Sequence, residues 1–437
     1  MEYWALVMFL VLVLALMAGF PVAFTLGAVA TLFGGIFLGF DFFDLLPLRI
    51  WGVMTNFTLL AVPLFVFMGV MLEKSGLAED LLETMGALFG RLRGGLALSI
   101  VFVGALLAAT TGVVGATVVT MGVIALPAML KHGYAPQLAT GTIAASGTLG
   151  QIIPPSIILI LLGDVIGVPV GRLFIGAVVP GLLLISLFAL YIVWKAWRHP
   201  ECAPALAAGA PGSLAKRVAT SLLPPLLLVF AVLGSIFFGV ASPTESAAVG
   251  ALGAMLLAGV RRRLRLRNLQ EAMRQTTRLT SMVFLILIGA TAFGLVFRGM
   301  GGDDLVKELM TGLPGGQWGF LIFSMLLIFG LGFFLDFLEI CFIVVPILAP
   351  IAQHFGIDLM WFALLIAVNL QTSFLTPPFG FSLFYLKAVA PPEVRISHIY
   401  AGVLPFVGAQ ILTIAVLVGF PDLVQWLPDL MDELHGF

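Results

Sequence analysis

The chain has 437 residues, of which 61% are hydrophobic and 10% are charged, and its formal net charge is −1. A soluble domain usually carries about 25% charged residues, so this composition excludes a protein whose whole surface faces water. The small net charge also leaves no basic field that would bind nucleic acid. We therefore expect an all-α, polytopic protein in a lipid bilayer, because a helix satisfies its backbone hydrogen bonds within one segment.

Apolar stretches follow one another from the first residues to residue 420. The N-terminal stretch lacks a basic start, so it indicates a first membrane helix rather than a cleaved signal. One span needs about 20 apolar residues. Several later stretches are too long for one span or are interrupted by Gly and Pro, and we expect about ten to twelve spans, some of them broken or re-entrant.

Basic residues indicate the orientation of the chain. Lys and Arg concentrate in three stretches, residues 74–93, 195–217 and 261–278. The positive-inside rule places all three in the cytoplasm and the N-terminus outside. Residues 201–217 are rich in Ala, Gly and Pro, and we expect them to form a cytoplasmic linker between two membrane halves, 1–200 and 218–437.

The two halves share a pattern of prolines and polar residues. In each half a proline (Pro127 or Pro346) is followed by an apolar stretch and then by a polar segment with Pro-Pro, at Gly150–Ser156 and at Thr376–Gly380. Such duplication is typical of transporters built from inverted repeats. We expect two re-entrant helical hairpins, near residues 137–163 and 359–388.

These polar segments suggest binding sites. Pro-Pro has no backbone N–H and interrupts a helix, and the carbonyl groups that lose their donors are costly in hydrocarbon unless they line a cavity or bind something. Such carbonyls suit Na⁺, whereas helix N-termini suit an anion. One break alone could be a structural kink, but two at matching positions favour a function. The polar segments contain five candidate solute ligands: Gln151, Ser156, Asn369, Gln371 and Gly380.

Acidic residues are unusual in this apolar context. An ionised carboxylate near the bilayer centre costs at least ~2.5–3.5 kcal/mol, so Asp336 is expected to face a cavity or a partner. A fold-back of the chain would bring it to the second Pro-Pro segment as a cation ligand. Glu339 is either functional or reaches an interface or an arginine. Asp164 is expected at the water interface or at a functional position.

Glu245 has a local explanation. Ser242 can cap a helix that begins with Pro243, and Glu245 stands three residues after the cap, where it can return a hydrogen bond. The segment Thr110–Thr117 is a further weak point in a long apolar stretch, although its Gly and Thr residues could equally serve close helix packing.

Taken together, these segments resemble the large permease subunit of tripartite ATP-independent periplasmic (TRAP) transporters over essentially the whole chain. The resemblance is carried by four segments in this order: Thr110–Thr117, Gly150–Ser156, Ser242–Glu245, and Asn369 with Thr376–Gly380.

The resemblance implies an elevator-type secondary transporter in the bacterial inner membrane, driven by a Na⁺ gradient. Its partners would be a small four-helix membrane subunit and a periplasmic binding protein that delivers a small organic acid. The family's sodium sites would map to two sets of residues: Thr111, Val113, Gly150, Ile153 and Pro155 in the first half, and Asp336, Thr376 and Phe379 in the second. Many relatives carry Ser-Gly-Ser where this chain carries Thr111-Gly112-Val113, so Val113 could offer only its carbonyl oxygen.

Three alternatives stay open. A self-sufficient Na⁺/dicarboxylate carrier would work without a binding protein. An intramembrane aspartyl protease would need Asp164 and Asp336 to face each other, and a membrane scaffold would have no use for two polar Pro-Pro segments. The sequence has no phosphate-binding loop, no Gly-x-Ser-x-Gly and no metal-ligand spacing of its histidines, so we do not expect an enzyme.

Overall fold

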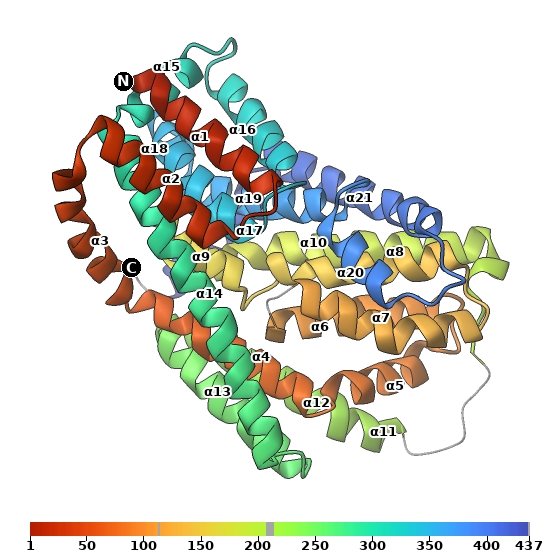
Figure 1. Cartoon of the computed structure of the whole chain (residues 1–437). Coiled ribbons are helices and arrows are strands. Elements are labelled where there is room, and N and C mark those ends of the chain that lie inside the picture. The colour runs from red at the N-terminus through yellow and green to blue at the C-terminus, as the bar shows by residue number, and fades with distance from the viewer. Residues whose placement is uncertain (112–113, 207–213, 436–437) are drawn as a thin grey trace.

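The computed structural model describes residues 1–111, 114–206 and 214–435, and all the regular structure in these ranges is helical (Figure 1). The α-helices of the first half are α1 (Glu2–Met17), α2 (Val22–Phe37), α3 (Leu46–Met54), α4 (Ala61–Lys74), α5 (Leu77–Phe89), α6 (Gly95–Thr111), α7 (Val114–Lys131), α8 (Pro136–Thr148), α9 (Ile157–Ile166) and α10 (Val170–Arg198).

The α-helices of the second half are α11 (Leu214–Arg217), α12 (Leu223–Phe237), α13 (Pro243–Val260), α14 (Leu266–Gly299), α15 (Gly302–Thr311), α16 (Gln317–Leu331), α17 (Phe337–Glu339), α18 (Val345–His354), α19 (Leu359–Leu375), α20 (Phe381–Val389), α21 (Ile396–Gly419) and α22 (Asp422–His435). Short π-helical segments, Val218–Leu222 and Ile340–Val344, join α11 to α12 and α17 to α18. The expected linker 201–217 therefore already becomes helical at Leu214, while residues 207–213 lie outside the described ranges.

The described residues contain fewer full-length spans than the sequence suggested. Seven helices are long and apolar enough to cross a membrane, or eight with the bent pair Phe40–Met54 and Thr58–Lys74, which turns by 56°. The expectation of ten to twelve spans was too high, because several apolar stretches are divided into helices of 10–17 residues.

The first Pro-Pro segment interrupts a helix but does not reverse it. α8 lies against α6, α7 and α21, whereas α9 lies against α10, α18 and α19. In Figure 1, α9 lies beyond the end of α8 and does not run back along it. The hairpin expected near residues 137–163 is therefore wrong in direction. The consecutive helices that lie side by side here are α6, α7 and α8.

The second half repeats this order of elements. A pair formed by α16 and the continuous segment α17–α18 precedes α19, which is interrupted at Thr376–Gly380 and followed by α20. α20 touches α19 near the break and lies mainly against α7 and α8. The segment near 359–388 is thus also an interrupted helix, and its second part packs on the first half of the chain.

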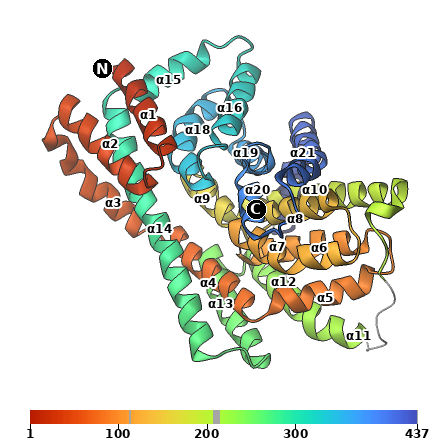
Figure 2. The ribbon, with the colours of Figure 1, turned by 45° about the vertical axis from the view of Figure 1, so that its right-hand side comes forward.

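A separate group of long helices flanks the interrupted ones. α4 packs on α13 and α14, and α14 also packs on α2. At one end of this group Arg261 forms an ion pair with Asp80 of α5 and donates a 3.1 Å hydrogen bond to the carbonyl oxygen of Thr220. Figures 1 and 2 both place α11 and the turn between α13 and α14 at the opposite end of the molecule from the N-terminus and α15.

Candidate functional site

The two interrupted helices meet at a buried polar junction. Gln371 of α19 donates a 3.1 Å hydrogen bond to the hydroxyl oxygen of Thr148, the last residue of α8. Gln410 of α21 donates to the same oxygen at 3.4 Å. All three side chains are completely buried, so the junction ties the first break to the second half within the protein interior.

The first break is closely packed and lies within the protein. It begins with a 3₁₀ turn, Leu149–Gln151, and ends at Ser156, whose hydroxyl donates to the carbonyl oxygen of Gln151 at 3.1 Å. A methyl group on Gly150 would lie 3.4 Å from Ala108 of α6. The side-chain nitrogen and oxygen of Gln151 are buried and have no hydrogen-bond partner among the described residues.

The other residues predicted for a sodium site in the first half divide into two groups. Ile153 donates its N–H to the carbonyl oxygen of Leu149 at 3.0 Å, and Pro155 is buried and follows a cis peptide bond. Thr111 is the last residue of α6, but its side chain lies outside the description, as does Val113 entirely. The structure therefore places Gly150, Ile153 and Pro155 in one short non-helical segment. The roles of Thr111 and Val113 stay predictions.

The second break is more exposed at its tip. The hydroxyl of Thr376 donates to the carbonyl oxygen of Thr372 at 2.7 Å, and that of Ser382 donates to the carbonyl oxygen of Phe374 at 2.6 Å. A methyl group on Gly380 would collide with the carbonyl oxygen of Phe374, so only glycine fits there. Phe379 is 46% exposed, and the Pro377–Pro378 peptide bond is cis, as in the first break.

The segment that carries Asp336 packs against this second break. Gly332 lies so close to Ser373 that a methyl group would overlap its hydroxyl, and the ring of Phe334 lies 5.5 Å from that of Phe379. The predicted fold-back of Asp336 toward the second Pro-Pro segment is consistent with these contacts. One carboxylate oxygen of Asp336 accepts from the N–H of Phe337 at 2.7 Å.

Glu339 takes part in the same helix start. Its carboxylate accepts from the N–H of Asp336 at 3.0 Å and completes a capping box. The side chain is 7% exposed. Glu339 thus caps the helix, and none of the described residues pairs it with an arginine.

A cavity of about 440 Å³ opens beside Asp336. Its walls come from α7, α17, α20 and the end of α19, together with α4 and α14. The lining residues are Glu73, Val114, Gly115, Ala116, Val119, Thr120, Gln275, Asp336, Phe337, Phe374 and Tyr385. This volume lies in the range of small-molecule sites, about 300–1,000 Å³.

Sequence reasoning missed several polar residues of this cavity. Glu73 was overlooked because it precedes Lys74 at the end of an apolar stretch, where a charge is ordinary. The signal that could have found it is a carboxylate that directly follows the uninterrupted apolar run of residues 64–72. Gln275 and Tyr385 give no such signal, because only the packing of α14 and α20 brings them to the cavity.

The predicted solute ligands lie elsewhere. None of Gln151, Ser156, Asn369, Gln371 and Gly380 lines the cavity at Asp336. Asn369 donates to the carbonyl oxygen of Met325 on α16 at 2.7 Å, and it is 4% exposed. Asn369 and Gln371 thus join helices, whereas Ser156 and Gly380 form hydrogen bonds within their own breaks.

Glu245 has the local role that the sequence predicted. The N–H of Ser242 donates to its carboxylate at 2.8 Å, and its own N–H donates to the hydroxyl of Ser242 at 3.3 Å. The capping box at the start of α13 is therefore confirmed.

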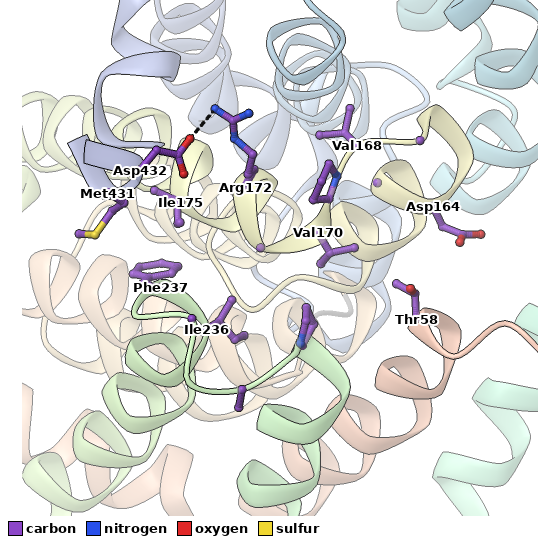
Figure 3. A pocket seen from close by; sticks show the side chains of 17 residues that line it. Thr58, Asp164, Val168, Val170, Arg172, Ile175, Ile236, Phe237, Met431 and Asp432 are labelled. Atoms are coloured by element: carbon purple, nitrogen blue, oxygen red, sulfur yellow. Dashed lines mark ion pairs between the residues drawn. The ribbon is translucent and has the colours of Figure 1, made fainter. Parts of the chain in front are cut away.

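Asp164 lines a second cavity, of about 670 Å³, which Figure 3 shows from close by. Its carboxylate accepts a hydrogen bond from the side chain of Asn56. On the other side of this cavity Arg172 of α10 pairs with Asp432 at 3.0 Å and with Asp429 at 3.5 Å, which holds α22 in place. Asp164 and Asp336 line different cavities, so they do not form the facing pair that an aspartyl protease would need.

Long apolar helices, paired interrupted helices and a buried polar junction between them define a multi-pass membrane protein of the transporter class. The sequence assigns the family: the model of the tripartite ATP-independent periplasmic transporter, DctM component, matches residues 7–423. The chain belongs to this family of TRAP transporter large permeases, and it is a transporter component and not an enzyme.

Similar proteins with known names are also TRAP transporter large permeases. The C4-dicarboxylate TRAP transporter large permease protein DctM of Pseudomonas aeruginosa is 31% identical over 387 residues, which cover 88% of this chain and 89% of the relative. The sialic acid TRAP transporter large permease protein SiaM of Vibrio cholerae is 30% identical over 418 residues, which cover 95% of this chain and 96% of the relative. The ectoine permease TeaC of Halomonas elongata is 29% identical over 420 residues, with the same coverage.

A solved structure supports the fold. The YdaH transporter of Alcanivorax borkumensis aligns with a TM-score of 0.64 over 95% of this chain and 99% of its own, at 16% sequence identity. At this identity the likeness concerns the fold alone.

Proposed function

We propose that this chain is the membrane permease of a Na⁺-driven import system for a small organic acid. In this proposal a periplasmic binding protein delivers the solute and a small four-helix membrane subunit accompanies the permease in the bacterial inner membrane. The observation that carries the proposal is the position of Asp336, a carboxylate at the wall of a cavity that α4 and α7 of the first half form with the second interrupted helix, α19 and α20.

The carboxylate of Asp336 could serve as a ligand for a transported cation. The backbone N–H groups of Phe337 and Glu339 donate to its carboxylate in the capping box, and no Lys, Arg or His of the described residues forms an ion pair with it. A carboxylate in such a place is stable only with a partner, and Na⁺ supplied by the gradient would be that partner. Thr376 and the carbonyl oxygen of Phe379 would complete this second site.

The first site would use backbone oxygens. Gly150, Ile153 and Pro155 belong to the non-helical or 3₁₀ stretch after α8, where carbonyl groups lack regular helical donors. Thr111, the last residue of α6, and Val113 would add further oxygens, as the resemblance implies. The unpartnered amide of Gln151 supports a bound species near this break, because an unsatisfied buried polar group costs about 1–3 kcal/mol.

The transport movement would be of the elevator type. The repeated order of a helix pair followed by an interrupted helix in each half supports an inverted repeat. The hydrogen bonds at Thr148 tie the two interrupted helices into one body, while α2, α4, α13 and α14 form the other group. A polar break is tolerable only when protein or water covers it, so both breaks and the solute would move together.

The named relatives transport C4-dicarboxylates, sialic acid and ectoine. A small solute with a carboxylate is therefore the class we propose here, bound in the cavity beside Asp336, whose lining does not include Gln151, Ser156, Asn369, Gln371 or Gly380.

The alternative is a self-sufficient Na⁺/dicarboxylate carrier, and one reconstitution separates the two. Proteoliposomes would contain the chain with or without the small subunit, and uptake would be followed with the binding protein present or omitted and with Na⁺ or K⁺ outside. The proposal predicts uptake only with all three proteins and Na⁺. Uptake by the chain alone would support the carrier, and equal uptake in K⁺ would refute sodium coupling.

A further inference from the structure

The cavity beside Asp336 contains a second carboxylate to which no role has been assigned. Glu73 is the second-last residue of α4, and its carboxylate accepts a 3.5 Å hydrogen bond from the hydroxyl of Thr120 on α7. Its neighbour Lys74 pairs instead with Glu271, at 3.8 Å. Glu73 therefore contributes a negative charge to a cavity that lies between α4, α7 and the second interrupted helix, α19 and α20.

The charge of this cavity limits what it can hold. Two of the lining side chains, those of Glu73 and Asp336, are carboxylates. The polar lining residues Gln275, Thr120 and Tyr385 are neutral, and none of the described lining residues is Lys, Arg or His. If Na⁺ neutralises Asp336, as proposed above, Glu73 remains. A dicarboxylate in this cavity would therefore meet a like charge in a partly desolvated place, which is strongly unfavourable.

A solute with a positive group would be attracted by Glu73 and not repelled. Its ammonium or amidinium group would pair with Glu73, and a charge-assisted hydrogen bond of this kind is among the stronger polar contacts. Its carboxylate has a place as well, because the 18-residue helix α7 begins at the cavity with Val114 and Gly115, and the N-terminus of a helix favours an anion.

We propose that Glu73 contacts the solute and selects a zwitterion, with one carboxylate and one cationic group, over a dicarboxylate. This inference rests on the proposed transport function and names the solute class of the same cavity. It assigns selection to the permease itself, in addition to any selection by a binding protein.

The test compares two probes of similar length and opposite charge pattern. Succinate carries two carboxylates, whereas 4-aminobutyrate carries a CH2–NH3⁺ group in place of one of them. The full-length chain with its small subunit would be placed in lipid nanodiscs, and half-saturating probe concentrations would be read from thermal stabilisation, in Na⁺ and in K⁺. The variants are Glu73→Gln and, as a matched control, Glu79→Gln, which neutralises an exposed carboxylate on the adjacent helix α5.

We expect the wild-type protein to bind 4-aminobutyrate about tenfold more tightly than succinate, on the scale of one charge-assisted contact. Glu73→Gln should remove this preference, and Glu79→Gln should keep it. Equal or tighter binding of succinate, a preference that survives Glu73→Gln, or no binding of either probe would overturn the inference. A preference that depends on Glu73 but is the same in Na⁺ and K⁺ would instead contradict the sodium coupling of the proposed function.

Discussion

Gln371, in the second half of the chain, donates a 3.1 Å hydrogen bond to Thr148, in the first half, and both side chains are completely buried. The Thr148 hydroxyl also accepts from Gln410 at 3.4 Å and donates to the carbonyl oxygen of Ala145 at 2.8 Å. One small hydroxyl thus joins three helices next to the first break.

Replacing this hydroxyl should destabilise the protein. Thr148→Val keeps the shape of the side chain but leaves the amides of Gln371 and Gln410 without their acceptor, and each unsatisfied buried group costs about 1–3 kcal/mol. We expect a lower melting temperature in nanodiscs. Thr220→Val, which removes an exposed hydroxyl bonded to its own helix, should melt like the wild type. An unchanged melting temperature in Thr148→Val would show that the junction adds no stability.

The close approach of α8 and α21 depends on two glycines. A methyl group on Gly402 would overlap the carbonyl oxygen of Gln137, and one on Gly141 would overlap that of Gly402. Gly402→Ala should force the helices apart and cost about 1–3 kcal/mol. Gly408→Ala, on the same helix with no atom within 4 Å of the new methyl, should preserve or raise stability. Equal melting temperatures for the two variants would contradict the packing described for α8 and α21.

Glu245 should affect stability without affecting sodium coupling. Glu245→Gln can still complete the capping box, whereas Glu245→Ala loses the bonds to Ser242 and should lower the melting temperature. The comparison to make is the melting temperature and the Na⁺ dependence of uptake for both variants. A large rise in the Na⁺ requirement of Glu245→Gln would mean that this carboxylate binds the ion after all.

The orientation of the chain also has a direct test. Helix α11, which holds the last residues of the linker 201–217, and the arginine-rich turn after α13 lie at the end of the molecule opposite the N-terminus. The positive-inside rule makes that end cytoplasmic. Alkaline phosphatase fused after Arg217 or Arg267 should be inactive, and a fluorescent protein at the same points should fluoresce. Phosphatase activity at either point would reverse the assigned orientation.

Local chemistry in the sequence predicted where helices end, but not where they go next. Pro154-Pro155 and Pro377-Pro378 interrupt helices as expected, because a helix cannot continue through them. Whether the chain then reverses depends on which surface receives the next helix, and α9 finds its partners in α10, α18 and α19. That surface is made by residues distant in the sequence, so the direction of α9 was predicted wrongly.

For the candidate site, too, the sequence showed local chemistry but not the packing of distant helices. Asp336 stood out because a carboxylate in an apolar stretch is costly. Glu73 did not, because its position beside Lys74 resembled an ordinary helix end, and only the packing of α4 against the interrupted helices places it in the cavity. Sequence alone also could not distinguish solute ligands from residues such as Asn369, whose amide is already bonded to Met325.

The central claim is that Asp336 binds the Na⁺ that drives transport, and the most direct measurement is the Na⁺ concentration that gives half-maximal solute uptake in proteoliposomes. Asp336→Asn removes the charge but keeps a good helix cap, and Glu339→Gln removes the other charge of the same capping box as a matched control. We predict that Asp336→Asn raises the half-maximal Na⁺ concentration about tenfold or more, while Glu339→Gln stays close to the wild type. An Asp336→Asn protein that transports with unchanged Na⁺ dependence would contradict the account.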